Sequence, residues 1–202
     1  MTRLAALLLT ALLAVPALAS AEEAPGALIS RVSLDLLDTL QKNGTPKGKR
    51  EIMALVDEKV LPHFDFARMT MLATGVGWRT ASEAQRAQLV EQFRTLLVRT
   101  YSTALTKYTN QTLDFMPERK SEDGKKALVR SLLKQPGAPT LTIDYRLAST
   151  TGGWKIYDVA VDGVSLVTTY RDSFAQEVRA GGIEGLVKML AAKNSQLAAQ
   201  DA

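Results

Sequence analysis

The sequence contains no cysteine and only one histidine among its 202 residues. The missing thiols exclude a disulfide framework, and one histidine without cysteine cannot supply the several ligands of a zinc site. No metal centre is therefore expected. The histidine, His63, lies between Pro62 and Phe64. Because no paired acid accompanies it, we expect it to pack at a helix boundary rather than to transfer protons.

The chain also lacks a hydrophobic run long enough to cross a membrane. Residues 4–15 are almost entirely apolar, but they fall short of the roughly 20 residues that a bilayer span requires. They follow Arg3 and lead to Ala17-Leu18-Ala19, a pattern typical of a cleavable secretory signal. We expect residues 1–21 to be a signal peptide, with an uncleaved anchor as the alternative. Lipoprotein attachment would need a cysteine and is not expected.

Neither sign of charge dominates the sequence. It has 25 basic and 21 acidic residues and a formal net charge of +4, which is too small and too dispersed to indicate a nucleic-acid-binding function. No internal repeat is present. The residues after the leader suffice to bury one core without disulfides, so we expect a single domain over residues 22–193. The small and polar residues 194–202 predict a flexible tail.

Helical spacing of apolar residues is the clearest pattern in the first half of the chain. It predicts one helix that begins near Leu28 and ends at Asn43-Gly44, and a second that begins at Thr45-Pro46 and ends before Pro62. The longest helix is expected over residues 81–108, after a capping-box pair formed by Thr80 and Glu83. Its apolar stripe consists of Leu89, Phe93, Leu97, Tyr101 and Leu105.

Alternation of apolar residues replaces helical spacing after Asn110 and predicts four antiparallel strands separated by turn sequences. In the last of these strands the parity of the apolar positions changes between Ile156 and Tyr157. Helices followed by an antiparallel sheet and by closing helices indicate an α+β fold. We expect the helices to pack on one face of the four-stranded sheet.

The segment 154–190 changes period once, at Asp162-Gly163, from alternation to helical spacing. This change predicts a strand that leads directly into a helix. We expect Ser165 to lie in the first turn of that helix and to satisfy backbone donors there. A turn with the sequence Gly-Ile-Glu-Gly-Leu follows at residues 182–186.

These features of segment 154–190, together with residues 62–66 and the turn at 75–78, resemble the toluene-tolerance family, the periplasmic phospholipid carriers of the MlaC type. The resemblance implies an apolar cleft between helices and sheet that holds the acyl chains of a diacyl phospholipid, with the headgroup outside. It also implies two partners, an outer-membrane lipoprotein–porin complex and an inner-membrane ABC transporter complex with its substrate-binding ring. It implies no cofactor, and the lipid is the cargo.

The apolar stripes alone would favour a solid core, because residues at helical spacing are usually packing residues. The resemblance instead implies that some of them line the cleft. The expected lipid-binding residues are Leu72, Phe93, Leu97, Tyr101, Leu105, Tyr145, Leu147, Val164, Val167, Tyr170 and Phe174. No catalytic residue is expected among them.

Two other functions are compatible with the sequence. The first is an enzyme with a pocket between helices and sheet, in which Asp144 or Asp158 would act as an acid or base and Tyr157 would stabilise an oxyanion. Both aspartates lie among alternating strand residues, where a solvated face is the commoner arrangement. The second is a non-catalytic adaptor for a membrane complex, which would bind through Trp78 and a basic turn.

The basic turn lies between the first two expected helices and contains Lys42, Lys47, Lys49 and Arg50. It resembles a phosphate-binding loop that is one residue short, follows a helix instead of a strand, and lacks the closing Ser or Thr. We therefore interpret it as an inter-helix turn whose exposed charges could assist docking to acidic partners or anionic headgroups.

Overall fold

The structure, a computed structural model, describes residues 22–42, 49–105 and 111–200. The expected signal peptide, the Asn43-Gly44 helix end, the start of the second helix and Lys47 lie outside these residues. No helix in the described ranges is long and apolar enough to span a membrane.

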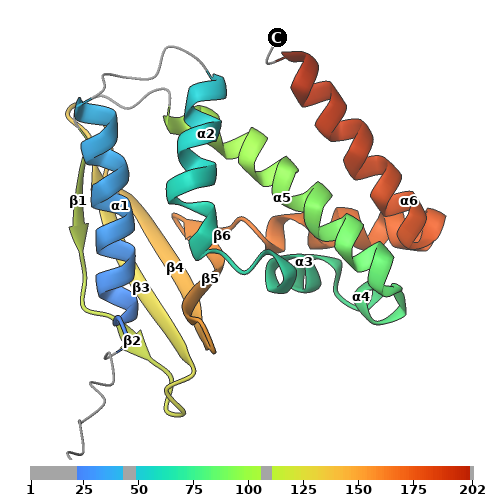
Figure 1. Ribbon diagram of the computed structural model, residues 1–202, viewed down its shortest axis with the longest axis horizontal. Coiled ribbons are helices and arrows are strands. Elements are labelled where there is room, and N and C mark those ends of the chain that lie inside the picture. The colour runs from blue at the N-terminus through green and yellow to red at the C-terminus, as the bar shows by residue number, and fades with distance from the viewer. Residues whose placement is uncertain (1–21, 43–48, 106–110, 201–202) are drawn as a thin grey trace, which may run out of the picture.

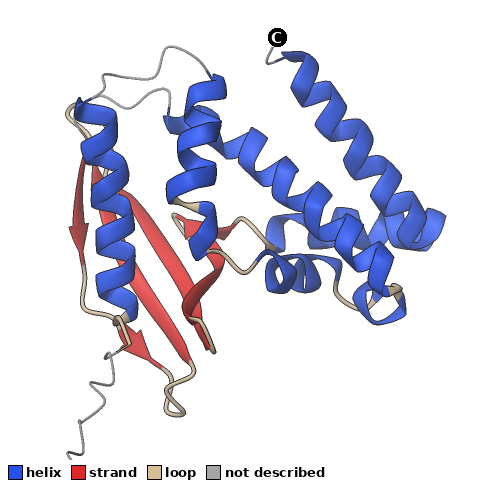
Figure 2. Cartoon of the chain, in the orientation of Figure 1, coloured by secondary structure: helices blue, strands red, loops and turns tan. Residues whose placement is uncertain are grey.

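The chain forms an α+β fold, as the sequence predicted (Figures 1 and 2). Its helical elements are α1 (Pro25–Lys42), α2 (Lys49–Lys59), the 3-10 turn η1 (Leu61–His63), α3 (Phe66–Thr74), α4 (Gly77–Thr80), α5 (Glu83–Leu105), the 3-10 turn η2 (Thr168–Tyr170) and α6 (Arg171–Gln200). Its strands are β1 (Thr112–Phe115), β2 (Arg119–Lys120), β3 (Lys126–Lys134), β4 (Leu141–Thr150), β5 (Gly153–Val161) and β6 (Val164–Ser165).

The antiparallel sheet has the strand order β1-β3-β4-β5-β6, and β2 also pairs with β3. The four predicted strands are present as β1, β3, β4 and β5. The prediction of four strands in all was wrong, because β2 and β6 have only two residues each and are too short to produce an alternation pattern. Helix α1 lies along the sheet (Figure 1).

One face of the sheet forms a hydrophobic core with α1. Its fully or nearly fully buried residues are Leu28, Ile29, Val32, Ala127, Val129, Leu147, Trp154, Ile156 and Val159. Ile156 pairs with Leu147 and Asp158 pairs with Arg146, so Tyr157 is an extra residue in β5. This β-bulge explains the change of parity in the sequence, because one additional residue moves the following side chains to the opposite faces.

The connection from the sheet to α6 differs from the prediction. Asp162 and Gly163 adopt positive φ angles of 47° and 83°, and Val161 pairs with Val164 across them. They form a two-residue hairpin turn, for which an Asp-Gly sequence is a strong signal. The strand therefore reverses into β6, and η2 precedes α6, so the prediction that the strand leads directly into a helix was wrong.

A second hydrophobic core joins α3, α5, η2 and α6, which lie beside the sheet (Figure 1). Phe93 and Phe174 are fully buried at its centre, with ring centroids 5.2 Å apart in an edge-to-face arrangement. The two closing helices expected from the sequence are the two halves of α6. They meet at Gly182, whose φ of 64° and ψ of −166° interrupt the helical backbone.

The C-terminal residues continue α6 to Gln200, where the sequence predicted a flexible tail from position 194. Asn194 is buried, and its Nδ2 donates a hydrogen bond of 2.9 Å to the backbone oxygen of Gln92 on α5. Local composition, on which the prediction of flexibility depends, does not reveal such a tertiary hydrogen bond.

The start of α5 is also capped differently from the prediction. The capping pair is Ser82 and Gln85: the amide of Gln85 donates to Ser82 Oγ at 3.2 Å, and the amide of Ser82 donates to Gln85 Oε1 at 3.0 Å. Thr80 Oγ1 instead donates to the backbone oxygen of Gly77. The sequence contains two overlapping cap patterns two residues apart, and the pattern nearer the helix is the one used.

We expect Ser82→Ala to lower the free energy of unfolding by about 1 kcal/mol, because it leaves an amide of the first turn without its acceptor. The matched control is Ser195→Ala, since Ser195 is exposed within α6 and its hydroxyl bonds only the preceding turn. The control should change stability little or increase it. Urea denaturation of both variants checks this, and equal losses would contradict the assigned cap.

Candidate functional site

A pocket of about 680 Å³ lies between three parts of the fold. They are the end of α3 with α4 (residues 71–79, called here the α3–α4 corner), strands β4 and β5, and the segment from Gly163 to the start of α6. Its lining residues are Met71, Leu72, Gly75, Val76, Trp78, Arg79, Arg146, Tyr157, Asp158, Gly163, Ser165, Val167, Thr168 and Arg171. They come from segments far apart in the sequence, so the pocket exists only in the folded chain. Its volume is typical of small-molecule and cofactor sites.

The α3–α4 corner supplies an apolar wall that is partly open to solvent. Helix α3 ends at Gly75, which has a φ of 61°, a left-handed conformation that favours glycine. Val76 follows and is 79% exposed, while Met71 and Leu72 on the last turn of α3 are more than a third exposed. Large apolar side chains left exposed around a concave site indicate a binding surface.

The opposite wall is buried and belongs to the helical core. Val167 is almost fully buried, lines the pocket, and also packs in the core that contains Phe93 and Phe174. Tyr170 packs against both aromatic rings, with its centroid 5.2 Å from that of Phe93. Val167 therefore separates the pocket from an aromatic cluster.

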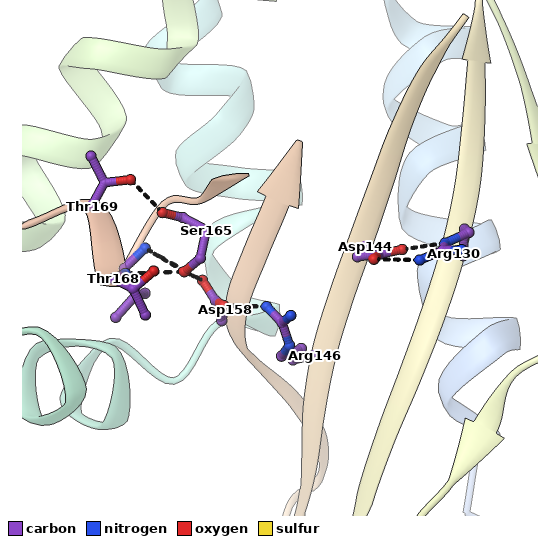
Figure 3. Close-up of polar contacts among 8 residues, drawn as sticks. Arg130, Asp144, Arg146, Asp158, Ser165, Thr168 and Thr169 are labelled. Atoms are coloured by element: carbon purple, nitrogen blue, oxygen red, sulfur yellow. Dashed lines mark hydrogen bonds and ion pairs between the residues drawn. The ribbon is translucent and has the colours of Figure 1, made fainter. Parts of the chain in front are cut away.

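A network of hydrogen bonds fixes the position of this wall (Figure 3). Asp158 on β5 accepts from Arg146 Nη1 at 2.6 Å, from Ser165 Oγ at 2.8 Å and from the amide of Val167 at 3.3 Å. Ser165 Oγ accepts in turn from the amide of Thr168 at 3.0 Å. Ser165 thus satisfies backbone donors as expected, although it does so from β6 and not from the first turn of a helix.

Three arginines line the same pocket: Arg79 from α4, Arg146 from β4 and Arg171 from the start of α6. Arg146 is held by Asp158 and remains partly exposed. A pocket lined by both apolar side chains and arginines suits an amphiphile whose polar end is anionic, because guanidinium groups pair well with phosphate and carboxylate oxygens.

A second pocket of about 540 Å³ adjoins the first and shares Gly75, Val76, Thr168 and Arg171 with it. Gly77 lines this second pocket at a close contact between α4 and α6. A Cβ atom at Gly77 would lie 3.2 Å from side-chain atoms of both Val178 and Ile183. Glycine at this position therefore allows the corner to approach α6 closely.

The carboxylates considered for acid–base catalysis are both engaged by arginines on the outer face of the sheet (Figure 3). Asp144 accepts two hydrogen bonds from Arg130, of 2.6 and 2.7 Å, and this pairing lowers the pKa of Asp144 below its usual value. The aspartates are buried beneath these partners, so the solvated face expected for them is only partly realised. Tyr157 lies under the guanidinium of Arg68, 4.3 Å from its ring centroid.

The eleven expected lipid-binding residues are distributed over several environments. Leu72 and Val167 line the first pocket, and Phe93, Leu97, Tyr170 and Phe174 lie behind it in the helical core. Tyr145 and Leu147 lie in the core between α1 and the sheet, on the opposite face of the sheet from Arg146. The side chain of Leu105 lies outside the described part.

The remaining two expected residues are more exposed. Val164 follows the Asp-Gly turn and is 61% exposed. Tyr101 is 37% exposed, and burial of its phenol together with the neighbouring Tyr170 raises its pKa to about 12.

Other residues singled out in the sequence have identifiable surroundings. Trp78 lines the first pocket, and the guanidinium of Arg86 lies 5.4 Å from its ring centroid. Burial, with Arg31 and Lys155 nearby, lowers the pKa of His63 at the end of η1. Lys42 pairs with Asp38 at 2.8 Å. In the described ranges, no three His, Cys, Asp or Glu side chains are grouped to hold a metal ion.

Sequence reasoning missed the pocket arginines and the exposed residues Met71 and Val76. The arginines are separated by tens of positions and follow no common period. Only Arg146 carried a signal, because it falls on the polar side of an alternating strand together with Asp144. Convergence of the other two depends on how the α3–α4 corner docks on the sheet.

Comparison with known proteins identifies the family. The family model described as MlaC protein matches residues 30–192. The chain belongs to the MlaC family. It is 27% identical over 180 residues to the toluene tolerance protein ttg2D of Pseudomonas putida, an alignment that covers 87% of this chain and 82% of that protein.

Two further proteins are similar over most of the chain. The chain is 26% identical over 184 residues to the intermembrane phospholipid transport system binding protein MlaC of Haemophilus influenzae, covering 88% of this chain and 86% of that one. A solved structure of a phospholipid-binding protein from Ralstonia solanacearum, in complex with a phospholipid, superposes with a TM-score of 0.78 at 35% identity. That match covers 86% of this chain and 98% of the solved chain.

Proposed function

We propose that the protein is a periplasmic carrier of diacyl phospholipid that requires no catalytic step and no cofactor. After export and cleavage of residues 1–21, it holds the acyl chains in the pocket between the α3–α4 corner, β6 and α6. It exchanges lipid with an outer-membrane lipoprotein–porin complex and with an inner-membrane ABC transporter complex that carries a substrate-binding ring. Membership of the MlaC family supports this assignment, as does the phospholipid bound by the Ralstonia relative.

The observation that carries the proposal is the pairing of an apolar wall with three arginines at one pocket. Leu72 and Val167 would contact the acyl chains, and Arg79, Arg146 and Arg171 would face the phosphate. A purely apolar ligand would offer no anion to Arg79 and Arg171, and a small polar ligand would leave the exposed apolar corner uncovered. A phospholipid satisfies both requirements.

Long acyl chains would reach beyond this wall. Phe93, Leu97, Tyr170 and Phe174 lie directly behind Val167 in the helical core. We infer that chains which pass Val167 displace this cluster and replace its contacts with contacts of similar apolar character. The cost of this exchange depends on how well the displaced side chains pack in their new positions.

Enclosure of the chains explains why a carrier uses a pocket. At about 0.8 kcal/mol per methylene, exposure of two chains of roughly 15 carbons to water would cost on the order of 20 kcal/mol. Spontaneous release is therefore negligible. Transfer between the pocket and a bilayer is nearly neutral, so the direction of transfer must come from the partner complexes.

Native mass spectrometry tests the proposal. We expect protein purified without leader and without detergent to carry about one diacyl phospholipid, because escape into water is so costly. Organic extraction should release the same lipid. A spectrum of apo protein alone, with no uptake from liposomes, would exclude the carrier function.

A further inference from the structure

A shallow groove of about 260 Å³ lies on the outer face of the sheet next to the lipid pocket. It is lined by Arg119, Lys120, Ser121, Lys126, Ala127, Leu128, Arg146 and Tyr157. Arg146 and Tyr157 line both the groove and the lipid pocket. The two depressions therefore adjoin at these two side chains, and a headgroup that extends from the pocket past Arg146 would reach the groove.

The register of the sheet sets two groove cations beside Arg146. Arg119 pairs with Leu128, and Leu128 pairs with Arg146, so these three side chains form one row across β2, β3 and β4. Lys126 lies two residues before Leu128 and therefore on the same face. Lys120 has the opposite parity; it pairs with Glu118 at 3.2 Å, and its ammonium lies 5.8 Å from the ring centroid of Trp154.

The groove is electropositive. No acidic residue lines it, and within the described part of the chain neither Arg119 nor Lys126 forms a salt bridge. The pKa of Asp123, on the adjacent turn, is lowered first by a hydrogen bond from Ser121, and Asp123 lies close enough for Lys126 to contribute to the lowering. Its field reaches the neighbouring Asp144, whose pKa is lowered first by Arg130 and further by Arg146 and Arg119. Arg68, which covers the ring of Tyr157, adds another cation where groove and pocket meet.

We propose that this groove is a headgroup site that selects anionic over zwitterionic phospholipids. The inference rests on the proposed carrier function. With the phosphate beside Arg146, the part of the headgroup beyond the phosphate would lie between Arg119 and Lys126. Two cations there repel the ammonium of a choline headgroup, whereas they accept a hydroxylated or further anionic headgroup.

The test uses mixed vesicles that contain equal amounts of phosphatidylglycerol and phosphatidylcholine with identical acyl chains. Delipidated full-length mature protein is incubated with them until its lipid composition is constant, then recovered and extracted for mass spectrometry. Because one surface presents both lipids, electrostatic attraction of the protein to the vesicle favours neither. The ratio of the two bound lipids measures selection by the site, and their sum measures the carrier function separately.

We expect the parent protein to favour phosphatidylglycerol. In the double variant Arg119→Gln/Lys126→Gln, the ratio of bound phosphatidylglycerol to phosphatidylcholine should fall roughly fivefold, which corresponds to an interaction of about 1 kcal/mol between charges near a surface. Total loading should not change, since neither residue lines the lipid pocket. The matched control is Lys188→Gln/Lys193→Gln, which removes two exposed charges from α6. It should keep the parent ratio.

Added salt should reduce the parent preference, because the groove is open to solvent. A parent ratio of one, or equal ratios in the groove variant and its control, would overturn the proposal even if loading is normal. The proposal would also be overturned if the groove variant kept the parent ratio but lost binding to an acidic partner protein, because the groove would then be a docking surface. Absence of lipid from the parent would instead exclude the carrier function itself.

Discussion

Leu72→Glu is expected to lower the affinity for phospholipid about thirtyfold, while the fold remains intact. Leu72 lines the pocket but is 37% exposed, so a carboxylate there is tolerated when the pocket is empty. Bound acyl chains would remove water from it, at a cost of roughly 2 kcal/mol or more for a partly buried charge. A carboxylate would also compete with the lipid phosphate for the pocket arginines. Loading from liposomes, measured by lipid extraction, gives the affinity.

Leu34→Glu is the matched control for this substitution. Leu34 lies on α1, is 50% exposed and lines none of the pockets described above. The Leu34→Glu variant should therefore load phospholipid normally, and circular dichroism should show that both variants are folded. Val167→Glu, at the buried wall, should lose lipid as well if it folds. Equal loading of Leu72→Glu and Leu34→Glu would remove the α3–α4 corner from the lipid site.

Asp158→Ala is expected to lower the free energy of unfolding by about 3 kcal/mol. The change leaves Ser165 Oγ without its acceptor and frees Arg146 from its buried partner. The amide of Val167 keeps only its 3.2 Å hydrogen bond to Ser165 Oγ. Removal of one partner from a buried, hydrogen-bonded ion pair usually costs several kcal/mol. The β6–η2 segment should loosen, so phospholipid loading should fall too. Urea denaturation of the lipid-free protein measures the stability loss.

Asp144→Ala provides the comparison for that result. Asp144 lies on the same face and pairs with Arg130, whose side chain is about as exposed as that of Arg146. Within the described part of the chain, however, Asp144 accepts hydrogen bonds from Arg130 and from no backbone amide. We expect its loss to cost at least 1 kcal/mol less than that of Asp158. If both substitutions destabilise the protein equally and leave lipid loading unchanged, Asp158 does not position the pocket wall.

The helices and strands that the sequence predicted well are those in which buried side chains recur at a regular spacing. The stripe that contains Leu89, Phe93 and Leu97 does form the buried side of α5. Alternation located the long strands, and the parity change at Ile156 and Tyr157 marked a real bulge. In each case the pattern extends over several residues of one element, so local geometry suffices to determine it.

Elements that depend on a few residues or on distant contacts were not predictable in this way. Strands β2 and β6 are too short for a period. The Asp162-Gly163 turn was visible in the sequence, but its hairpin becomes evident only when Val164 pairs back with Val161. Asn194 is polar and close to the terminus, and its burial depends on Gln92, which is 102 residues away in the sequence.

The proposed lipid site illustrates a different limit. A regular spacing of apolar residues indicates which side chains are buried. It does not distinguish the wall of a pocket from a solid core, because both produce the same spacing. Phe93 and Leu147 therefore appeared equivalent in the sequence, although they lie in two separate cores. Arg79 and Arg171, which give the pocket its charge, belong to segments whose approach is set by the tertiary packing of α4 against α6.

Photo-crosslinking of bound lipid tests the central claim most directly. A phospholipid with a diazirine in the middle of one acyl chain is loaded into the mature protein, irradiated, and mapped by peptide mass spectrometry. We predict that crosslinks concentrate in residues 71–79 and 163–171, which form the walls of the pocket, and that excess unlabelled phospholipid removes them. Crosslinks confined to the core between α1 and the sheet, or insensitive to the competitor, would contradict the assignment of this pocket as the lipid site.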